Sequence, residues 1–458
     1  MALTGNANHE SRITSAQLVE ALKEIRARTL ELVADLSETQ LIGPRLQIVN
    51  PPRWEIGHIA WFQEFWILRH LSGQPPILEH GDKLYDSALV AHHTRWDLPL
   101  LEINETRRFM EGVLERIIDQ VSNESCSLKD AEGYDQEYFL NLVLLHEQMH
   151  DEAITYTRQT LSYPAPTLAV TSKGRLAEHN EARGQTRDDV TRDAQIPGGK
   201  FILGSTHEER FVFDNEQSAH EVEVAPFAIS KTAVSQGQFR NFVEDGGYKR
   251  SDLWTEEGWE WRTAVGAGHP VYWRRERNAW LRQNFDEWVA LDERLPVIHV
   301  NCHEADAYCR WADRRLPTEL EWEMAASAEP TENGRGLTTR KRRYPWGDDL
   351  PRPECANLDW SAMGCLPIDA LPAGDSAFGC RQMIGNVWEW TSSDFKPYPG
   401  FVAGPYREYS EPWFGDHKVL RGGCWATGSR LIHNSYRNFY SPDRRDVWAG
   451  FRTCARNI

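Results

Sequence analysis

Apolar residues recur at helical spacing along four stretches of the N-terminal part of the chain. The stretches are residues 15–36, 57–71, 104–121 and 135–161. Polar segments separate them, and Ser15 is expected to cap the first helix. Four long amphipathic helices with polar connections predict an up-and-down helical bundle.

One connection of this predicted bundle is long. Residues 72–100 join the second and third helices and carry aromatic residues and charges of both signs. A segment of this composition is expected to pack against the bundle, because long ordered loops often carry function.

The pattern changes beyond residue 170. Residues 171–194 are rich in charge and nearly free of large apolar side chains, which is typical of a linker. Segments that read as short strands and turns follow at residues 196–205, 220–239 and 295–301.

Regular helices are few in this second region, where residues 301–315 and 318–328 have the helical pattern. The mixture predicts an α+β domain with many loops. We therefore expect a multidomain chain with a helical bundle at 13–165, a charged linker at 166–194 and an α+β domain at 195–458.

Composition narrows the function of this 458-residue chain. Its formal charge of −17 argues against binding to nucleic acid or to anionic membranes, which need a basic face. The sequence lacks a signal-peptide pattern and any apolar run of about 18 residues, so a cytoplasmic location is expected. The eight cysteines are scattered, which favours free thiols, although their concentration after residue 300 is compatible with a thiol or copper site.

Histidines on two predicted helices suggest a metal site. His146 and His150 lie four residues apart, so both project from one helix face. Such a pair is more often incidental, but His58 in another helix stands among aromatic residues, where a lone histidine would be costly without a partner. Bundles assemble metal sites from facing helices, and neutral imidazole suits Fe, Zn, Cu or Ni. Glu152 is expected to orient a ligand imidazole, and Glu147 to face away from the pair.

Aromatic residues and arginines gather near the C-terminus, in a chain with 19 tryptophans. Residues 383–391 and 419–426 combine aromatics with glycines, and residues 435–452 add arginines beside aromatics. One interpretation is the core of an α+β fold with buried Arg–Asp pairs. The other is a surface that binds a zwitterionic or cationic ligand through aromatic faces and arginine forks, for which Trp425 and Arg445 are candidates.

Motifs in both regions resemble known families. GHIAWFQEF at 57–65 and HEQMHDE at 146–152 resemble the DinB-type four-helix bundle. GNVWEWT at 385–391, VLRGGCWA at 419–426 and RNFYSPDRRDVWAGFRTC at 437–454 resemble the formylglycine-generating-enzyme, or sulfatase-modifying-factor, domain, which has a C-type-lectin-like fold. Together the two domains resemble the ergothioneine sulfoxide synthases (EgtB) and the selenoneine synthases (SenA).

The resemblance implies a mononuclear non-haem Fe(II) enzyme with O2 as co-substrate. Such an enzyme joins a sulfur or selenium donor to C2 of the imidazole of hercynine. Carried across by motif, the iron ligands are His58, His146 and His150. The family has two tyrosines shortly before VLRGG, one of which supplies a proton; here they are Tyr406 and Tyr409, of which Tyr406 is favoured.

The same resemblance assigns the substrate pocket and shows three departures. Asn438 and Phe439 are candidates for the hercynine carboxylate and trimethylammonium group. Met149 stands where the family has a glutamine that touches the imidazole, Arg95 lies where the family has an LSRP-like donor-binding loop, and Tyr440 replaces an acidic residue. Two departures fall on the donor side, so a selenosugar is the expected donor, with cysteine or γ-glutamylcysteine as the alternative.

Two other functions remain open at this level. A formylglycine-generating oxidase would need a copper-binding cysteine pair, for which Cys424 and Cys454 lie in the relevant region, and would leave the bundle unexplained. A non-catalytic lectin-like binding module would bind no metal tightly and would tolerate His150→Ala.

Overall fold

The computed structural model describes residues 14–123, 128–169, 192–205 and 211–456. The chain divides into two compact units, Met1–Ile154 and Thr155–Ile458. We call them the helical unit and the loop-rich unit. Most of the predicted linker at 166–194 lies outside the described residues, so the domain boundaries expected from the sequence stay a prediction.

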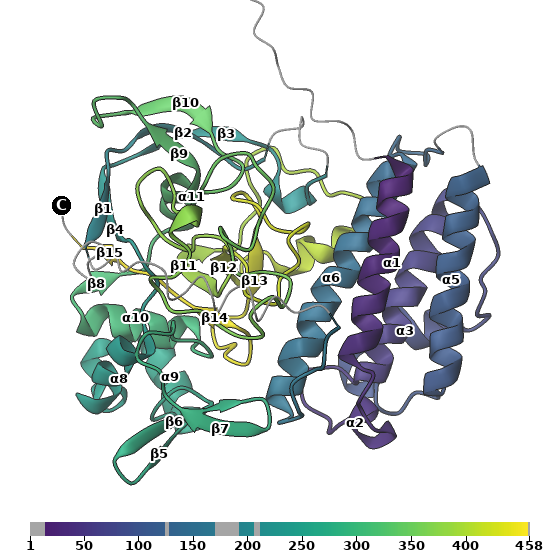
Figure 1. Cartoon of the computed structure of the whole chain (residues 1–458), viewed down its shortest axis with the longest axis horizontal. Coiled ribbons are helices and arrows are strands. Elements are labelled where there is room, and N and C mark those ends of the chain that lie inside the picture. Colours follow the sequence, from purple (N-terminus) through teal and green to yellow (C-terminus); the bar gives the residue numbers. More distant parts are fainter. Residues whose placement is uncertain (1–13, 124–127, 170–191, 206–210, 457–458) are drawn as a thin grey trace, which may run out of the picture. The chain divides into compact units, whose positions relative to one another are not determined.

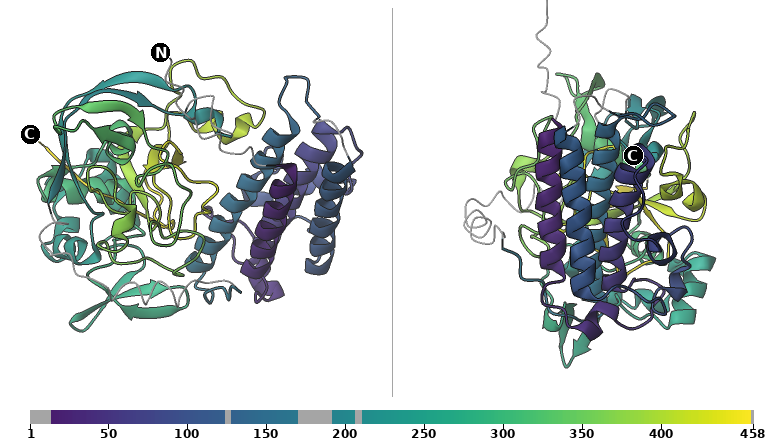
Figure 2. Two further views of the ribbon diagram at one scale, coloured as in Figure 1. Left: turned by 45° about the horizontal axis from the view of Figure 1, so that its top comes forward. Right: turned by 90° about the vertical axis from the view of Figure 1, so that its right-hand side faces the viewer.

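The predicted helical bundle is confirmed. The helical unit contains α1 (Ser15–Leu32), α2 (Glu38–Ile42), α3 (Pro52–Gln63), α4 (Gly81–Tyr85), α5 (Ile103–Asn123) and α6 (Gln136–Thr160), whose last turn groups with the loop-rich unit. A π-helical segment, Glu64–Leu71, continues α3 without a break. The long helices run side by side (Figure 1, Figure 2).

The first helix begins one residue from its expected cap. Thr14, rather than Ser15, is the N-cap, and its hydroxyl accepts a hydrogen bond from the backbone N–H of Gln17. The Gln17 side chain in turn accepts from the backbone N–H of Thr14. This reciprocal pair is a capping box, which outweighs the preference of serine for the N-cap.

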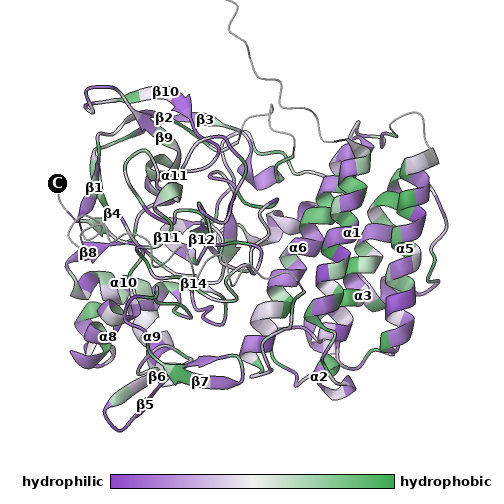
Figure 3. Cartoon of the chain, in the orientation of Figure 1, coloured by the Kyte–Doolittle hydropathy of each residue, from purple (hydrophilic) through white to green (hydrophobic). Residues whose placement is uncertain are grey.

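Helix α3 forms the centre of the bundle, because all twelve of its residues are buried. A helix that is buried on every side must meet partners all around it. The amphipathic α1 and α5, whose polar and apolar residues are visible in Figure 3, turn residues such as Leu22 and Val113 inward. Pro52 occupies the first turn of α3, where its missing N–H costs nothing.

The long connection 72–100 packs on the bundle as expected. The indole of Trp54 donates to the backbone oxygen of Leu84 at 2.8 Å, and the indole of Trp61 donates to Asp82 at 2.7 Å. Gly57 allows the closest approach, since a Cβ at this position would lie 2.3 Å from the ring of Tyr85. The sequence thus brings the backbone of Tyr85 against α3.

The loop-rich unit is built from small sheets, as its α+β prediction requires. Its strands are β1 (Asp193–Ile196), β2 (Gly199–Leu203), β3 (His220–Val224), β4 (Phe227–Ser230), β5 (Trp273–Glu276), β6 (Ala279–Asn284), β7 (Glu287–Ala290), β8 (Arg314–Arg315), β9 (Ala328–Pro330), β10 (Leu337–Lys341), β11 (Trp388–Asp394), β12 (Lys418–Arg421), β13 (Asn438–Tyr440), β14 (Ala449–Gly450) and β15 (Cys454–Ala455). Two four-stranded sheets have the orders β1-β4-β15-β8 and β13-β12-β11-β14. A three-stranded sheet, β5-β6-β7, and the pairs β2-β3 and β10-β9 complete the set seen in the described residues.

Helices lie between these strands. They are α8 (Gln236–Glu244), α9 (Glu256–Val265), α10 (Cys302–Trp311) and α11 (Glu319–Ser327). The last two match the predicted helices. The predicted strand at 295–301 is wrong: this segment forms an isolated bridge from Pro296 to Ser235 and then leads into α10.

The structure also bears on two expectations from composition, the lack of a membrane-spanning helix and the state of the cysteines. None of the helices within the described residues is long and apolar enough to cross a bilayer. The seven described cysteines are free thiols, six of them buried.

Candidate metal centre and substrate-binding residues

Three histidines converge inside the helical unit. His58 projects from α3, and His146 and His150 project from one face of α6, four residues apart. Each offers a ring nitrogen, and these atoms all lie within 4.8 Å of one another. His58 and His146 are each 2% exposed, so the cluster sits at the inner side of the bundle.

Hydrogen bonds fix which ring nitrogen of two histidines is protonated. The Nδ1 of His58 lies 2.7 Å from the backbone oxygen of Tyr85, which can only accept, so this nitrogen carries the proton. The Nδ1 of His150 likewise donates to the carboxylate of Glu55. When either ring is neutral, its Nε2 keeps the lone pair that binds a metal.

The electrostatics of the cluster favour a cation. Burial, together with the charge of His150, lowers the pKa of His58 to about 3. Burial also places the pKa of His146 well below its usual value. The Nε2 atoms of His146 and His150 lie 3.2 Å apart, and two lone pairs at that distance need a proton or a cation beside them. The three-imidazole donor set, with His58 and His146 neutral, thus fits a divalent transition metal.

Aromatic rings hold the histidines in place. Trp54 stacks on His58 with ring centroids 4.7 Å apart and planes 9° apart. Phe62 stacks on His146 at 3.6 Å and 8°. Both aromatic residues belong to α3, so this helix supplies one ligand and the packing surface of another.

The opposite side of α6 is fixed by a buried ion pair. Glu147 accepts from the Nε of Arg26 on α1 at 2.8 Å and from Gln63 on α3 at 2.6 Å. Arg26 also donates to the backbone oxygen of Met110 on α5 at 2.6 Å. Glu147 therefore points away from the histidine pair, as expected, and links all four long helices.

Three predicted site residues lie near the histidines in sequence or space. Met149 is half-buried on α6, three residues after His146 and so on the same helix face. Glu152 is buried, and the carboxylate that accepts from His150 is that of Glu55, so orientation of a ligand imidazole by Glu152 stays a prediction. Arg95 is 8% exposed, and its guanidinium donates to Asn50.

The two predicted tyrosines meet in the loop-rich unit. The rings of Tyr406 and Tyr409 stack with centroids 5.9 Å apart. The hydroxyl of Tyr409 forms a 2.9 Å hydrogen bond with that of Tyr436. The ring of Phe439 lies against the ring of Tyr409, with centroids 5.5 Å apart. Burial raises the pKa of Tyr409 far above its usual range, so its phenol stays neutral.

The candidate substrate residues Asn438 and Phe439 lie on a regular strand. Asn438 and Phe439 belong to β13, which pairs with β12 in antiparallel register. The side-chain oxygen of Asn438 accepts the backbone N–H of Phe439 at 2.8 Å. Tyr440 ends the strand and lies under the guanidinium of Arg444, 5.3 Å from its ring centroid.

Two other candidates have structural partners. Trp425 is fully buried and packs on Trp448 with ring centroids 4.9 Å apart, as the core interpretation predicted. Arg445 lies over Trp261 at 5.1 Å and forms a long ion pair with Glu304. Substrate binding by either residue stays a prediction.

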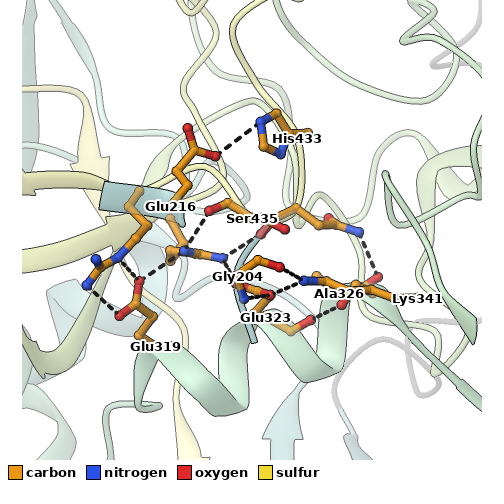
Figure 4. Close-up of polar contacts among 12 residues, drawn as sticks. Gly204, Glu216, Glu319, Glu323, Ala326, Lys341, His433 and Ser435 are labelled. Atoms are coloured by element: carbon orange, nitrogen blue, oxygen red, sulfur yellow. Dashed lines mark hydrogen bonds and ion pairs between the residues drawn. The ribbon is translucent and has the colours of Figure 1, made fainter. Parts of the chain in front are cut away.

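A buried ionic network supports the strands of this region. Figure 4 shows Glu319 and Glu323 of α11 turned into one cluster. Arg421 binds both carboxylates, at 3.0 Å to Glu319, and the amine of Lys341 donates to Glu323 at 2.6 Å. Arg437, directly before Asn438, donates to Glu319 at 2.7 Å.

The same network reaches residues 404–410, which contain Tyr406 and Tyr409 and which we call the tyrosine loop. The guanidinium of Arg437 donates to the backbone oxygen of Asn215 at 2.7 Å, and the side chain of Asn215 donates to Ser410 at 3.0 Å. Ser410 follows Tyr409 and donates to Asp214. Strand β13 and the tyrosine loop are thus held by one set of buried polar contacts.

Sequence reasoning missed Glu55 and Asp214. Glu55 had a readable signal, because it precedes His58 by three residues and an E-x-x-H pair shares one helix face. Asp214 had none, since its partners Ser410 and Gly404 lie almost two hundred positions away in the chain.

Comparison with known proteins finds two families that match different parts of the chain. A family model of the sulfatase-modifying factor enzyme 1-like domain matches residues 178–458, and one of the DinB superfamily matches residues 21–154. A formylglycine-generating enzyme from Streptomyces coelicolor is 31% identical over 336 residues, which cover 64% of this chain and 95% of that protein.

Longer matches include the helical unit as well. A hercynine oxygenase from Mycolicibacterium thermoresistibile is 36% identical over 446 residues, covering 95% of this chain and 94% of the relative. A hercynine oxygenase from Mycobacterium tuberculosis is 37% identical over 440 residues, covering 95% and 98%. The chain therefore belongs to the hercynine oxygenase family and is an oxidoreductase.

Proposed function

We propose that this protein is an Fe(II)- and O2-dependent enzyme that joins a chalcogen donor to C2 of the imidazole of hercynine. The observation that carries the proposal is the convergence of His58, His146 and His150 in a chain of this family. Imidazole ligands suit Fe(II). When bound, iron supplies the redox chemistry that activates O2.

Residues of the loop-rich unit are assigned to hercynine. The amide of Asn438 donates to its carboxylate, and the face of Phe439 attracts its trimethylammonium group. Tyr406 donates the proton that the reaction needs. Tyr409 keeps Tyr406 in place by stacking, while its own hydroxyl is engaged by Tyr436.

The donor that we propose is a selenosugar. Met149 offers a thioether where the resemblance expects a glutamine that touches the imidazole, so this chain departs there from the sulfur-using pattern. Arg95, the one arginine that the sequence placed at the donor, is bound to Asn50 and nearly buried. The bond from Arg95 to Asn50 competes with a contact to an amino-acid carboxylate, which a neutral sugar does not require.

A thiol donor, cysteine or γ-glutamylcysteine, is the second candidate. The identity of 34–37% to three hercynine oxygenases over almost the whole chain favours a donor shared with those relatives. The two candidates share the iron site and hercynine, so they differ in one reactant alone.

Turnover with purified protein, Fe(II), O2 and hercynine tests both the proposed reaction and the proposed donor. Cysteine, γ-glutamylcysteine and a selenosugar are compared as donors, and products are identified by mass spectrometry. We expect selenoneine-type product with the selenosugar, and none from His146→Ala. Turnover with thiols alone would overturn the selenium donor, and absence of both turnover and metal binding would overturn the function.

A further inference from the structure

Glu55 connects two of the candidate ligands. It lies one turn before His58 on α3, and its carboxylate accepts the Nδ1–H of His150 on α6. The side chain is 2% exposed, so the imidazole is its partner in place of water. A carboxylate in this position fixes the ring orientation and raises the basicity of the nitrogen that binds metal.

A second hydrogen bond fixes Glu55 from its other oxygen. The amide nitrogen of Asn50 donates to Glu55 at 2.5 Å, and the amide oxygen of Asn50 accepts from Arg95 at 2.6 Å. The Asn50 amide accepts from Arg95 and donates to Glu55, and Glu55 also accepts from His150, so the hydrogen bonds of Arg95 and His150 meet at one carboxylate. Hydrogen bonds that run in one direction, as from Arg95 through Asn50 to Glu55, strengthen one another.

Arg95 also reaches His58 by a separate route. Its guanidinium lies over the ring of Trp54, 3.8 Å from the centroid, and Trp54 stacks on His58. A cation over an indole face is attracted to it, more strongly when both are shielded from water. The guanidinium therefore braces two ligands, one through hydrogen bonds and one through stacking.

We propose that Glu55 is a positioning residue of the metal centre, and that Arg95 acts through Asn50 and Trp54 to hold His150 and His58 in their binding orientation. The inference rests on the proposed function of the three histidines as metal ligands. It gives Arg95 a different role from the donor contact that its place in the sequence suggested.

Metal binding to the full chain tests the role of Glu55. Metal-free protein is titrated with Co(II), and thermal unfolding of the metal-free protein reports the fold. Glu55→Gln keeps the shape of the side chain but replaces the carboxylate, so we expect about 10- to 100-fold weaker Co(II) binding. The thermal midpoint without metal should change little. The NMR signal of the Nδ1–H of His150 should also shift in this variant, without any metal present.

Arg95→Gln tests the brace. We expect weaker Co(II) binding by about tenfold, and a double variant with Glu55→Gln should lose less than the product of the two single effects, because both act on His150 through one carboxylate. Arg45→Gln is the matched control. Arg45 forms an exposed pair with Asp97 in the same unit, and its loss should leave Co(II) affinity unchanged.

The outcomes separate this inference from its alternatives. Wild-type affinity in Glu55→Gln, or a lower thermal midpoint with unchanged affinity, would show a purely structural role and overturn the proposal. Unchanged Co(II) affinity in Arg95→Gln with a raised KM for the donor would show that Arg95 grips the donor instead. Failure of the wild-type protein to bind Co(II) would overturn the proposed function, not the positioning role alone.

Discussion

The two units position functional side chains by different physical means. In the helical unit, His146 and His150 face one way because of helix geometry, and most of their supporting contacts come from α3. In the loop-rich unit, Tyr409 and Phe439 lie together because long-range ionic and polar contacts hold their loop and strand. Both units contain buried charges that must be paired, but in the loop-rich unit such contacts connect segments that lie farther apart in the chain.

Removal of a buried arginine gives the largest expected contrast between the units. Arg421→Met leaves Glu319 and Glu323 without one of their cations, at a cost of about 3–5 kcal/mol in unfolding free energy. Arg340→Met, which removes an exposed pair with Asp348, should change stability by less than about 1 kcal/mol. Denaturant titration measures both, and Co(II) affinity of folded protein should stay at the wild-type value. A parallel loss of Co(II) affinity would contradict the independence of the metal centre.

The difference between local and long-range contacts also explains which features the sequence could predict. Helical periodicity revealed the bundle and the pair of His146 and His150, since both depend on residues a few positions apart. His58 lies far from this pair in the chain, and only its aromatic neighbours and the family resemblance joined it to the site. The sheet β5-β6-β7 escaped, because its strands are half-exposed and lack an alternating apolar pattern. The contact between Arg437 and Asn215 spans 222 positions, and a pairing of that range leaves no local signal.

Acid should lower the stability of the loop-rich unit through His299, which is not one of the proposed metal ligands. Burial lowers the pKa of His299 to about 3 from an unfolded value of 6.5. The folded state therefore binds fewer protons between these values, and stability present above pH 6.5 is lost as the pH falls toward 3, by about 2–3 kcal/mol between pH 6.5 and 4.5. Urea midpoints across this range measure the slope.

His299→Asn tests the assignment of that slope. The backbone φ of this residue is 60°, a conformation that asparagine accepts more readily than most residues. The variant should lose stability at neutral pH but show a flatter acid response, whereas His80→Asn, at an exposed position, should keep the wild-type slope. An unchanged slope in His299→Asn would assign the acid response to other groups.

Overpacking next to α3 should damage the metal centre without touching a ligand. Gly57→Ala places a methyl group against the ring of Tyr85, so the segment whose backbone oxygen holds His58 must move. We expect a loss of about 1–3 kcal/mol in stability together with weaker Co(II) binding. Gly112→Ala on α5 meets no atom within 4 Å and should be neutral or stabilising. Equal behaviour of the two variants would show that the approach of Tyr85 is not needed for the site.

The smallest expected effect lies in the tyrosine loop. Ser410→Ala removes the hydroxyl that donates to Asp214 and accepts from Asn215, which costs about 1 kcal/mol of local stability. Amide hydrogen exchange across residues 404–410 should become about fivefold faster by that energy, and kcat should fall while Co(II) affinity stays constant. Ser441→Ala, which removes an exposed hydrogen bond to Asp443, should alter neither the amide exchange of residues 404–410 nor kcat. Because the loop carries the proposed proton donor and the metal centre depends on α3 and α6, a change in Co(II) affinity after Ser410→Ala would mean that the two positioning systems are one.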